Sequence, residues 1–377
     1  MLTAETRRRD FPSLQGRTYL NTAAEGIPPI AVRDALLQYF ADKQLGMDGR
    51  VLHAAQWQAA RERTAALFGL TADEVAICSC SSEAFNLAAL ALRLSDGDEV
   101  VINDLDFPAG ATPWLQESCP ATVKLWRQRS GILRTEDLIS LLGPRTRFVT
   151  TSLVSFFNGA MIPLDEVVSA VRCHSPALIG VDVTQALGRV PLRLDDVDLI
   201  VSSTHKWILA SHGGGLVGVP SRSAERWSVP AGGWFHLHDP FGPERFDRAQ
   251  SKLGAAGFGV GMPNYPAIYA IHAALDYILS IGVPAIHAAA QPLTQMCLDE
   301  IARLPVELLT PRDHRLLAGI IAFRHPQADR IHQCLHEKNI HLMAHAGRLR
   351  IAIHGYNTPA DIDTLFRELR VAMRLVG

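Results

Sequence analysis

Short runs of β-branched and other apolar residues alternate with amphipathic stretches through the middle of the chain. Seven such runs predict strands, at residues 74–78, 99–103, 123–127, 147–154, 177–182, 197–202 and 215–219. Between several of them the apolar positions recur at helical spacing, at residues 82–94, 135–142 and 164–173. Strands that alternate with helices favour a mostly parallel sheet covered on both faces, so the predicted fold class is α/β.

The pattern changes after residue 264. Two long helical stretches come first, and shorter strands and helices follow. We expect helices at residues 265–281, 286–304, 326–338 and 359–375, and strands at residues 319–323 and 348–353. This α+β pattern predicts a second, smaller domain. The predicted division is residues 1–20, which pack with the small domain, a large domain of residues 21–265, and a small domain of residues 266–377.

Composition narrows the class of protein. The chain has 377 residues, of which 48% are hydrophobic and 20% are charged, as in an ordinary folded enzyme. Its formal net charge of −2 disfavours a nucleic-acid binder, which normally carries a basic excess. No stretch approaches the roughly 18 uninterrupted apolar residues of a spanning helix, and residues 7–9, three arginines, do not precede a signal-peptide core. We therefore expect a cytoplasmic protein that binds neither nucleic acid nor membrane.

The six cysteines are scattered and have no disulfide spacing, which suits a reducing compartment. Cys78 and Cys80 form a C-x-C pair, but no second pair accompanies them, so we expect no metal site. Both side chains are expected to be buried and structural.

Several common motifs can be dismissed. The chain contains no G-x-x-x-x-G-K-[ST], which excludes a P-loop, and in residues 257–262 Met262 stands where a dinucleotide-binding loop needs its third glycine. The H-G-G-G of residues 212–215 resembles a lipase oxyanion loop, yet no G-x-S-x-G supplies the nucleophile. A hydrolase is therefore disfavoured.

Two ionisable residues stand at the ends of consecutive predicted strands. Asp182 ends the strand at residues 177–182, and Lys206 follows the strand at residues 197–202. Lysine is strongly hydrated and rarely buried, so its place after an apolar strand is unusual. Pyridoxal phosphate (PLP) chemistry uses such a pair, because the lysine forms a Schiff base with the cofactor and the carboxylate keeps the pyridine nitrogen protonated. On spacing alone, a surface lysine and a helix-capping aspartate would explain the same pattern.

The motifs around this pair resemble those of the class V aminotransferases, a family of fold-type I PLP enzymes. D-x-x-Q at residues 182–185 precedes T-H-K-W at residues 204–207. The resemblance extends from Y-L-N-T-A-A at residues 19–24, through S-S-E-A-F-N at residues 81–86, to R-I-A-I-H-G-Y-N-T at residues 350–358. It therefore covers nearly the whole chain. The family includes cysteine desulfurases, selenocysteine lyases, kynureninases and isopenicillin N epimerase-like proteins.

For the cofactor ring, the resemblance implies that Lys206 is the Schiff-base lysine and that Asp182 pairs with the pyridinium nitrogen. Gln185 would hydrogen-bond the ring hydroxyl. Phe107 would stack on the ring, with a core position as the alternative reading. Asn158 is expected near the ring substituents.

For the cofactor phosphate, the resemblance implies a site at the start of a helix. Ser81 and Ser82 fall in a turn that matches the family's G-T-T-E-A, so their hydroxyls and backbone N–H groups would hold the phosphate. Ser203 and His205 would add contacts from the lysine loop.

For the substrate, Arg350 matches the arginine that binds the α-carboxylate in this family. A planar guanidinium suits bidentate recognition of a carboxylate, and Arg324 and Arg348 are nearby alternatives. Asn21 would line the substrate side. Of the histidines, His354 is the one expected to reach the substrate, as a possible acid.

Two features depart from the family. Desulfurases carry a nucleophilic cysteine on a loop, but residues 339–348 are short and contain none, and Cys334 is expected in a helix. Met262 stands where the family has a threonine that reaches the neighbouring subunit's phosphate, and methionine cannot donate that hydrogen bond.

These residues predict a homodimeric PLP enzyme, with its active site near the interface, that acts on an amino acid through an external aldimine. Freed Lys206 would take the α-proton. We expect β-elimination of the C–S lyase type, or transamination, rather than sulfur transfer through a cysteine. The alternatives are an epimerase or carbon–carbon bond-forming enzyme of a biosynthetic pathway and, from another class, a non-catalytic PLP-binding regulatory protein.

Overall fold

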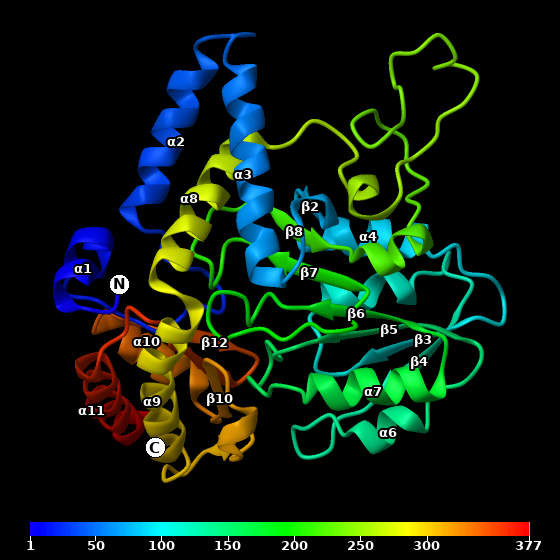
Figure 1. Cartoon of the computed structure of the whole chain (residues 1–377). Coiled ribbons are helices and arrows are strands. Elements are labelled where there is room, and N and C mark those ends of the chain that lie inside the picture. The colour runs from blue at the N-terminus through cyan, green and yellow to red at the C-terminus, as the bar shows by residue number, and fades with distance from the viewer. Residues whose placement is uncertain (377) are drawn as a thin grey trace.

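The computed structural model describes residues 1–376, which form a large seven-stranded sheet, a small four-stranded sheet and a two-stranded pair (Figure 1). The large sheet has the strand order β2-β8-β7-β6-β5-β3-β4. Its strands are β2 (Val75–Cys78), β3 (Glu99–Asn103), β4 (Thr122–Trp126), β5 (Thr146–Ser152), β6 (Leu178–Asp182), β7 (Leu199–Ser203) and β8 (Gly215–Gly218). Within this sheet β8 alone runs antiparallel to its neighbours. The predicted α/β class with a mostly parallel sheet is confirmed, and all seven predicted strands are present.

Helices bury both faces of this sheet. One face packs against α3 (Arg50–Phe68), α7 (Leu164–His174) and α8 (Tyr265–Ile281), and the other against α4 (Ser81–Ala91) and α5 (Pro108–Ala111). Successive side chains alternate between the faces, so Ile200 joins the first core, whereas Leu199 and Val201 join the second. Because both faces are buried, the strands read as nearly continuous apolar runs.

The small sheet is antiparallel, with the order β12-β13-β10-β9. Its strands are β9 (Glu307–Leu308), β10 (Ile320–Arg324), β12 (Met343–His345) and β13 (Arg348–Ala352). The surrounding helices are α9 (Val283–Ile301), α10 (Ala328–Glu337) and α11 (Pro359–Val376). The predicted division into domains stays a prediction, and α8, which it assigns to the small domain, contributes Ile268 and Ile271 to the core of the large sheet.

The first 73 residues contain elements that the sequence pattern did not predict. These are α1 (Ala4–Asp10), β1 (Thr18–Tyr19), which pairs with β11 (Ile340–His341), and α2 (Ile30–Lys43), which runs beside α3. Leu37 and Phe40 on α2 are exposed, so its apolar residues do not mark a single buried face. Together α2 and α3 form a helical hairpin, the α2–α3 hairpin, which Tyr269 on α8 holds in place. The Tyr269 hydroxyl donates to the Asp42 carboxylate at 2.6 Å, and His53 Nδ1 lies 3.0 Å from the same hydroxyl.

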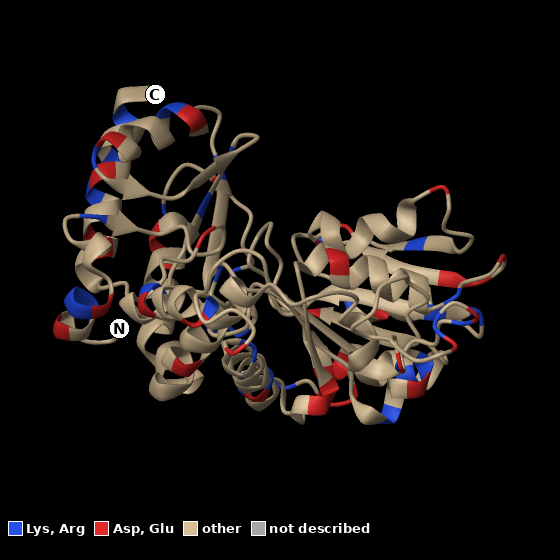
Figure 2. Ribbon diagram, turned by 90° about the horizontal axis from the view of Figure 1, so that it is seen from above, with Lys and Arg blue, Asp and Glu red and all other residues tan. Residues whose placement is uncertain are grey.

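Figure 2 shows the two sheets in separate lobes, with both marked chain ends beside the smaller one. The charged residues lie mostly on outer helices and loops. Within residues 1–376, no single helix has the length and apolar composition to cross a membrane, and α8 and α9 meet that test only as a pair bent by 75°.

Candidate active site

The carboxyl ends of β5, β6 and β7 meet the start of α4 at one edge of the large sheet, where open α/β sheets bind ligands. They enclose a cavity of about 190 Å³. Its lining includes all eight residues that were predicted to hold the cofactor, which are Ser81, Ser82, Phe107, Asp182, Gln185, Ser203, His205 and Lys206. Sequence motifs far apart in the chain therefore converge on one cavity.

Asp182 is buried and Lys206 is half-buried, and the two side chains act on each other electrostatically. Burial lowers the pKa of Lys206, which the charge of Asp182 opposes and that of Arg350 reinforces. Burial raises the pKa of Asp182, against the hydrogen bond that its Oδ1 accepts from the Thr184 N–H at 2.7 Å and the charge of Lys206. A lysine with a lowered pKa is more often neutral near pH 7, so its amine can act as a nucleophile or base.

The start of α4 forms an anion-binding end of the cavity. Ser81 and Ser82 occupy the first turn of the helix, and the Ser203 hydroxyl donates to Ser81 Oγ at 2.9 Å. Backbone N–H groups of a first helical turn lack intrahelical partners and attract an anionic group.

The two cysteines before α4 have different environments. Cys78 is buried at the end of β2, as expected, and its thiol lies 3.4 Å from the Phe258 carbonyl oxygen. Cys80 is exposed and lines the cavity, so the prediction that it is a buried structural residue is wrong. Its sulfur caps α4 by accepting from the Glu83 N–H at 3.4 Å, which requires it to stand outside the strand.

Gln185 is anchored by two buried contacts. Its amide nitrogen donates to the Ala23 carbonyl at 3.0 Å, and its carbonyl oxygen accepts from Trp207 Nε1 at 2.7 Å. These contacts fix the side chain at the wall of the cavity. A second hydrogen on the amide nitrogen remains to donate to a bound group.

Phe107 lies at the mouth of the cavity and is 41% exposed, which excludes the alternative of a core residue. The Lys206 ammonium lies 5.1 Å from the centroid of its ring. Phe156 packs edge-on against it, with ring centroids 5.1 Å apart. The ring is thus held next to the lysine with one surface open.

Arg350 on β13 is a buried arginine whose charge helps to lower the pKa of Lys206. Only 3% of it is exposed, Nη1 donates to the Phe156 carbonyl at 2.9 Å, and its buried Nε has no hydrogen-bond partner. Burial lowers its pKa to about 10. The alternatives are otherwise engaged, since Arg348 lies 4.3 Å from the Phe157 ring centroid and Arg324 forms an exposed ion pair with Glu307 at 3.2 Å.

The structure does not bring His354 or Asn158 to the cavity. Both nitrogens of His354 face the backbone, Nε2 toward Trp207 O at 2.7 Å and Nδ1 toward Gly355 N at 2.6 Å, and burial lowers its pKa to about 3. Asn158 donates to Gly131 O at 2.8 Å and accepts from Ala160 N at 3.1 Å. Both are structural side chains, so these two expectations are corrected.

Asn21 forms a parallel bridge with Ala352, beside the strand that carries Arg350. Its Oδ1 is buried without a hydrogen-bond partner, and the residue is not among those that line the cavity. A role in substrate binding stays a prediction.

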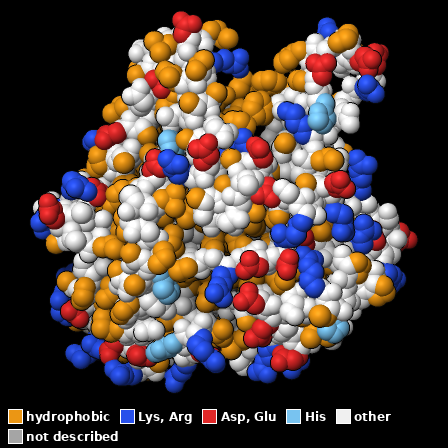
Figure 3. Space-filling model, in the orientation of Figure 1, with side chains coloured by type: hydrophobic (Ala, Val, Ile, Leu, Met, Phe, Trp, Pro, Cys, Tyr) orange, Lys and Arg blue, Asp and Glu red, His pale blue; other side chains and the backbone are white. Residues whose placement is uncertain are grey.

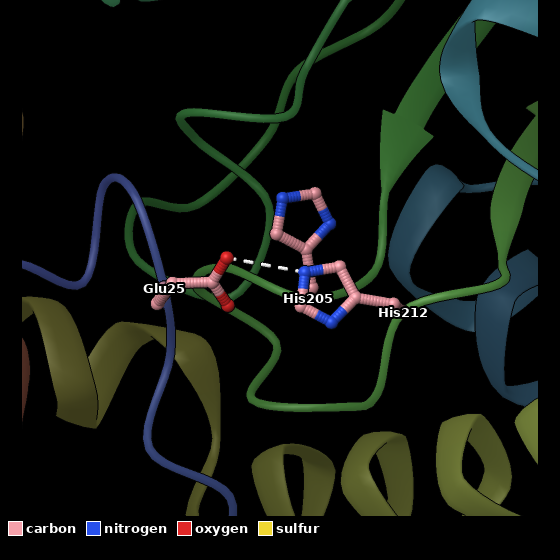
Figure 4. A group of neighbouring side chains, drawn as sticks. All are labelled: Glu25, His205 and His212. Atoms are coloured by element: carbon pink, nitrogen blue, oxygen red, sulfur yellow. Dashed lines mark hydrogen bonds and ion pairs between the residues drawn. The ribbon is translucent and has the colours of Figure 1, made fainter.

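Glu25, His205 and His212 form a cluster beside the lysine loop (Figure 4). The Glu25 carboxylate pairs with His212 Nε2 at 3.1 Å, and the two imidazoles stack with centroids 4.5 Å apart. Burial lowers the pKa of His205 to about 4, so its ring is neutral near pH 7. Their ligand atoms lie within 4.8 Å of one another, close enough for a metal ion, and the expected absence of a metal stays a prediction.

A tight hairpin lies directly before Arg350, in the segment where the sequence contains no cysteine. His345 pairs with Arg348, so β12 and β13 are joined by two residues, Ala346 and Gly347, both with positive φ. A two-residue turn of this type leaves no loop to extend into the cavity. Cys334 lies on α10 and packs against the core of the small sheet.

Sequence reasoning missed five residues that line the cavity. They are Cys80, Ser152, Val154, Phe156 and Thr184. Four of them end or follow β5 or β6, and Cys80 follows β2, so their places at strand ends could have indicated them.

Residues 18–365 match the family described as "Aminotransferase class-V". The chain is 26% identical to "Uncharacterized aminotransferase YcbU" of Bacillus subtilis (strain 168), over 97% of each chain. Its structure is similar to that of the cysteine desulfurase CsdA from Escherichia coli, with a TM-score of 0.87, 21% identity, and coverage of 99% of this chain and 98% of that one. It is also similar to a mutant of C-DES with glycine covalently linked to its PLP cofactor, with a TM-score of 0.86, 22% identity, and coverage of 96% and 98%. The likeness to these two structures is one of fold.

Proposed function

The chain belongs to the aminotransferase class-V family of PLP-dependent enzymes, and on that premise we propose that it converts an amino acid by β-elimination of the C–S lyase type or by transamination, without a cysteine nucleophile. The observation that carries the proposal is a single cavity that combines Lys206 and Asp182 with a nearby buried arginine that has no carboxylate partner.

The cavity residues fit PLP, which, when bound, supplies an electron sink for the bonds at Cα of an amino acid. Ser81, Ser82 and the N-terminus of α4 would hold its phosphate. Asp182 would hold the pyridine nitrogen, and Phe107 would cover the ring. With these roles, the phosphate, the pyridine nitrogen and the ring of the cofactor would each have a partner in the cavity.

We assign the preference for an α-carboxylate to Arg350, which is not among the residues that line the cavity but donates to the carbonyl of Phe156, which is. Arg350 is buried and forms no ion pair within residues 1–376. A buried cation without a counter-ion is costly, so an incoming carboxylate that pairs with it gains more than one that pairs at the surface. The unpaired Nε offers a further donor to that carboxylate.

Lys206 is the group that we assign to proton transfer at Cα. Its lowered pKa leaves more of the amine in the neutral form that can accept a proton. The other titratable residues that line the cavity have other contacts. Asp182 accepts from Thr184, Cys80 caps α4, and the His205 ring stacks on that of His212. Neither Cys80 nor Cys334 stands on the strand or turn before Arg350, which favours chemistry without a persulfide.

We also propose that the protein is a cytoplasmic homodimer with its active site near the interface. Exposed apolar side chains on the α2–α3 hairpin support this proposal, because large apolar patches on a soluble chain mark interaction surfaces.

The test is the visible absorbance of the purified protein. We expect a cofactor band that Lys206→Ala abolishes and that changes when one class of amino acid is added. Keto acid formed together with ammonia would indicate β-elimination, whereas an amino group transferred to an added keto acid would indicate transamination.

Cys80→Ala is the matched variant for the cysteine question. We expect it to retain turnover, and complete loss of sulfur release with an intact cofactor band would contradict the proposal. Inversion at Cα without loss of a group would favour the epimerase. No band after addition of PLP would overturn the whole assignment, and a band without any turnover would favour a regulatory protein.

A further inference from the structure

Asp106 is a second carboxylate behind the cavity that the proposed chemistry does not use. It follows β3, and both its oxygens accept hydrogen bonds. Oδ1 accepts from the Ser152 N–H at 2.6 Å, and Oδ2 accepts from the Asn103 side chain at 2.8 Å. Asp106 thus ties the segment after β3 to the end of β5.

This position links Asp106 to the cavity in two ways. Ser152 ends β5, lines the cavity, and is the register partner of Asp182, which ends the adjacent strand β6. Phe107 directly follows Asp106 in the chain and begins the turn into α5. The carboxylate therefore lies one strand away from Asp182 and holds the backbone from which the Phe107 ring projects.

The charge of Asp182 acts on Asp106. Burial raises the pKa of Asp106 to about 7, and the negative charge of Asp182 acts in the same direction. The other residues that line the small cavity beside the carboxylate are neutral. The cavity has a volume of about 10 Å³, room for about one water, and these residues are Asn103, Leu105, Ile132, Leu133, Ser152, Ser155, Ala160, Met161 and Ile162.

Asp182 ends β6 and Asp106 follows β3, with β5 between these two strands. The two carboxylates together make the potential at the ring end of the cavity more negative, and Lys206 is the cation that acts on Asp182. A cation placed beside Asp182 lowers the free-energy cost of ionising Asp106 as well. Asp106 accepts both of its hydrogen bonds, and accepted hydrogen bonds favour the ionised form of a carboxylate, so they act in the same direction as such a cation.

We propose that Asp106 is a positioning residue of the cofactor site, which fixes the backbone before Phe107 and adds its negative charge to that of Asp182 on the pyridine nitrogen. This inference rests on the proposed function, because it requires PLP in the cavity. A purely structural Asp106 would supply the same hydrogen bonds without an electrostatic effect.

The test compares Asp106→Asn with the matched control Asp104→Asn. Asp104 lies two residues earlier, is exposed, and accepts from the Gln128 N–H at 2.8 Å. The first readout is the pH midpoint of the visible absorbance change of the bound cofactor. Asp106→Asn should lower that midpoint by about 0.5–1 pH unit, because loss of a negative charge destabilises nearby cations. Asp104→Asn should leave it unchanged.

The second readout is the thermal midpoint of the PLP-free protein between pH 5 and pH 8. The folded-state pKa of Asp106 lies above its unfolded value, so its contribution to stability is fully present below the unfolded value and is lost as the pH rises through about 7. The wild type should therefore lose stability relative to Asp106→Asn over this range.

Equal absorbance midpoints in the wild type and Asp106→Asn, with a pH-independent stability difference, would overturn the inference. If Asp106→Asn does not fold, Asp106→Ser is a second neutral variant that keeps an acceptor for Ser152, and Asp106→Glu should retain the wild-type midpoint. A wild-type protein without any cofactor band would reject the proposed function instead, and the PLP-free stability curves would still show whether Asp106 carries the predicted charge.

Discussion

Arg350 shows how the surroundings of one side chain decide its role. It is buried and forms no ion pair within the described residues, whereas Arg324, also on the small sheet, is exposed and paired with Glu307. Both guanidinium groups have the same chemistry in isolation. Burial without a counter-ion makes the first one the better candidate for a substrate carboxylate.

Replacing this arginine should separate substrate binding from cofactor binding. We expect Arg350→Met to lower kcat/KM by about 30-fold or more, mainly through KM, because a buried charge-assisted contact is lost. Arg350→Lys should retain part of the wild-type activity, because lysine keeps the positive charge but cannot form the bidentate contact. Steady-state kinetics with the substrate found in the absorbance screen measure both. Arg324→Met is the control, and an equal rise in its KM would contradict the assignment.

The sequence could predict residues whose position depends on short local motifs. Lys206, Asp182 and Gln185 follow strand ends, so their convergence is a consequence of the parallel sheet. His354 and Asn158 were misassigned because their hydrogen-bond partners, Trp207 and Gly131, come from remote segments that no local pattern indicates.

Among the elements, the segment that follows β1 is held tightly against the lysine loop. Gly26 donates its N–H to the His205 carbonyl at 2.8 Å, and a Cβ on Gly26 would lie 2.0 Å from the Lys206 carbonyl oxygen. The segment and the loop can therefore approach this closely only with glycine at the contact.

Gly26→Ala should displace the lysine loop. Overpacking of this kind costs about 1–3 kcal/mol, so we expect a lower free energy of unfolding in urea and weaker retention of the cofactor on dialysis. Gly143→Ala is the matched control, since a Cβ there meets no atom within 4 Å. Equal behaviour of the two variants would show that the loop is free to move away.

The predictability of the elements depended on how their apolar residues are buried. Strands of the large sheet are covered on both faces, so their sequences are continuous apolar runs that predict strands. In α2, Leu37 and Phe40 are exposed, so the apolar residues of this helix do not follow one buried face and its sequence gives no clear helical pattern. The β12–β13 hairpin was also missed, because Ala346 adopts a positive φ that its residue type does not indicate.

At the scale of the whole molecule, Arg189 connects the large sheet to the C-terminal part of the chain. Its side chain is fully buried and donates to the carbonyl oxygens of Ile353 and Ala318 and to the Thr294 hydroxyl. These contacts satisfy a buried cation with neutral acceptors. They join segments more than 100 residues apart, which no local sequence pattern could predict.

The surface of the single chain also carries a testable expectation about assembly. Figure 3 shows hydrophobic side chains on the α2–α3 hairpin and on the projecting segment at the upper right. Met47 and Val51 on the hairpin are 73% and 74% exposed, and Phe241 and Phe246 on the segment are also exposed. Apolar side chains gathered in this way favour contact with a second copy over contact with water.

If this face forms the dimer, Met47→Glu combined with Val51→Glu should shift the protein toward the monomer, because two buried charges without partners oppose association. Sedimentation velocity over a range of concentrations measures the shift. Leu115→Glu combined with Leu375→Glu is the matched control, since these two exposed leucines lie elsewhere on the surface and should leave the dimer intact. Because the active site is proposed to lie near the interface, turnover should fall together with the dimer fraction in the first variant. A monomeric wild type, or a fully active monomer, would contradict this arrangement.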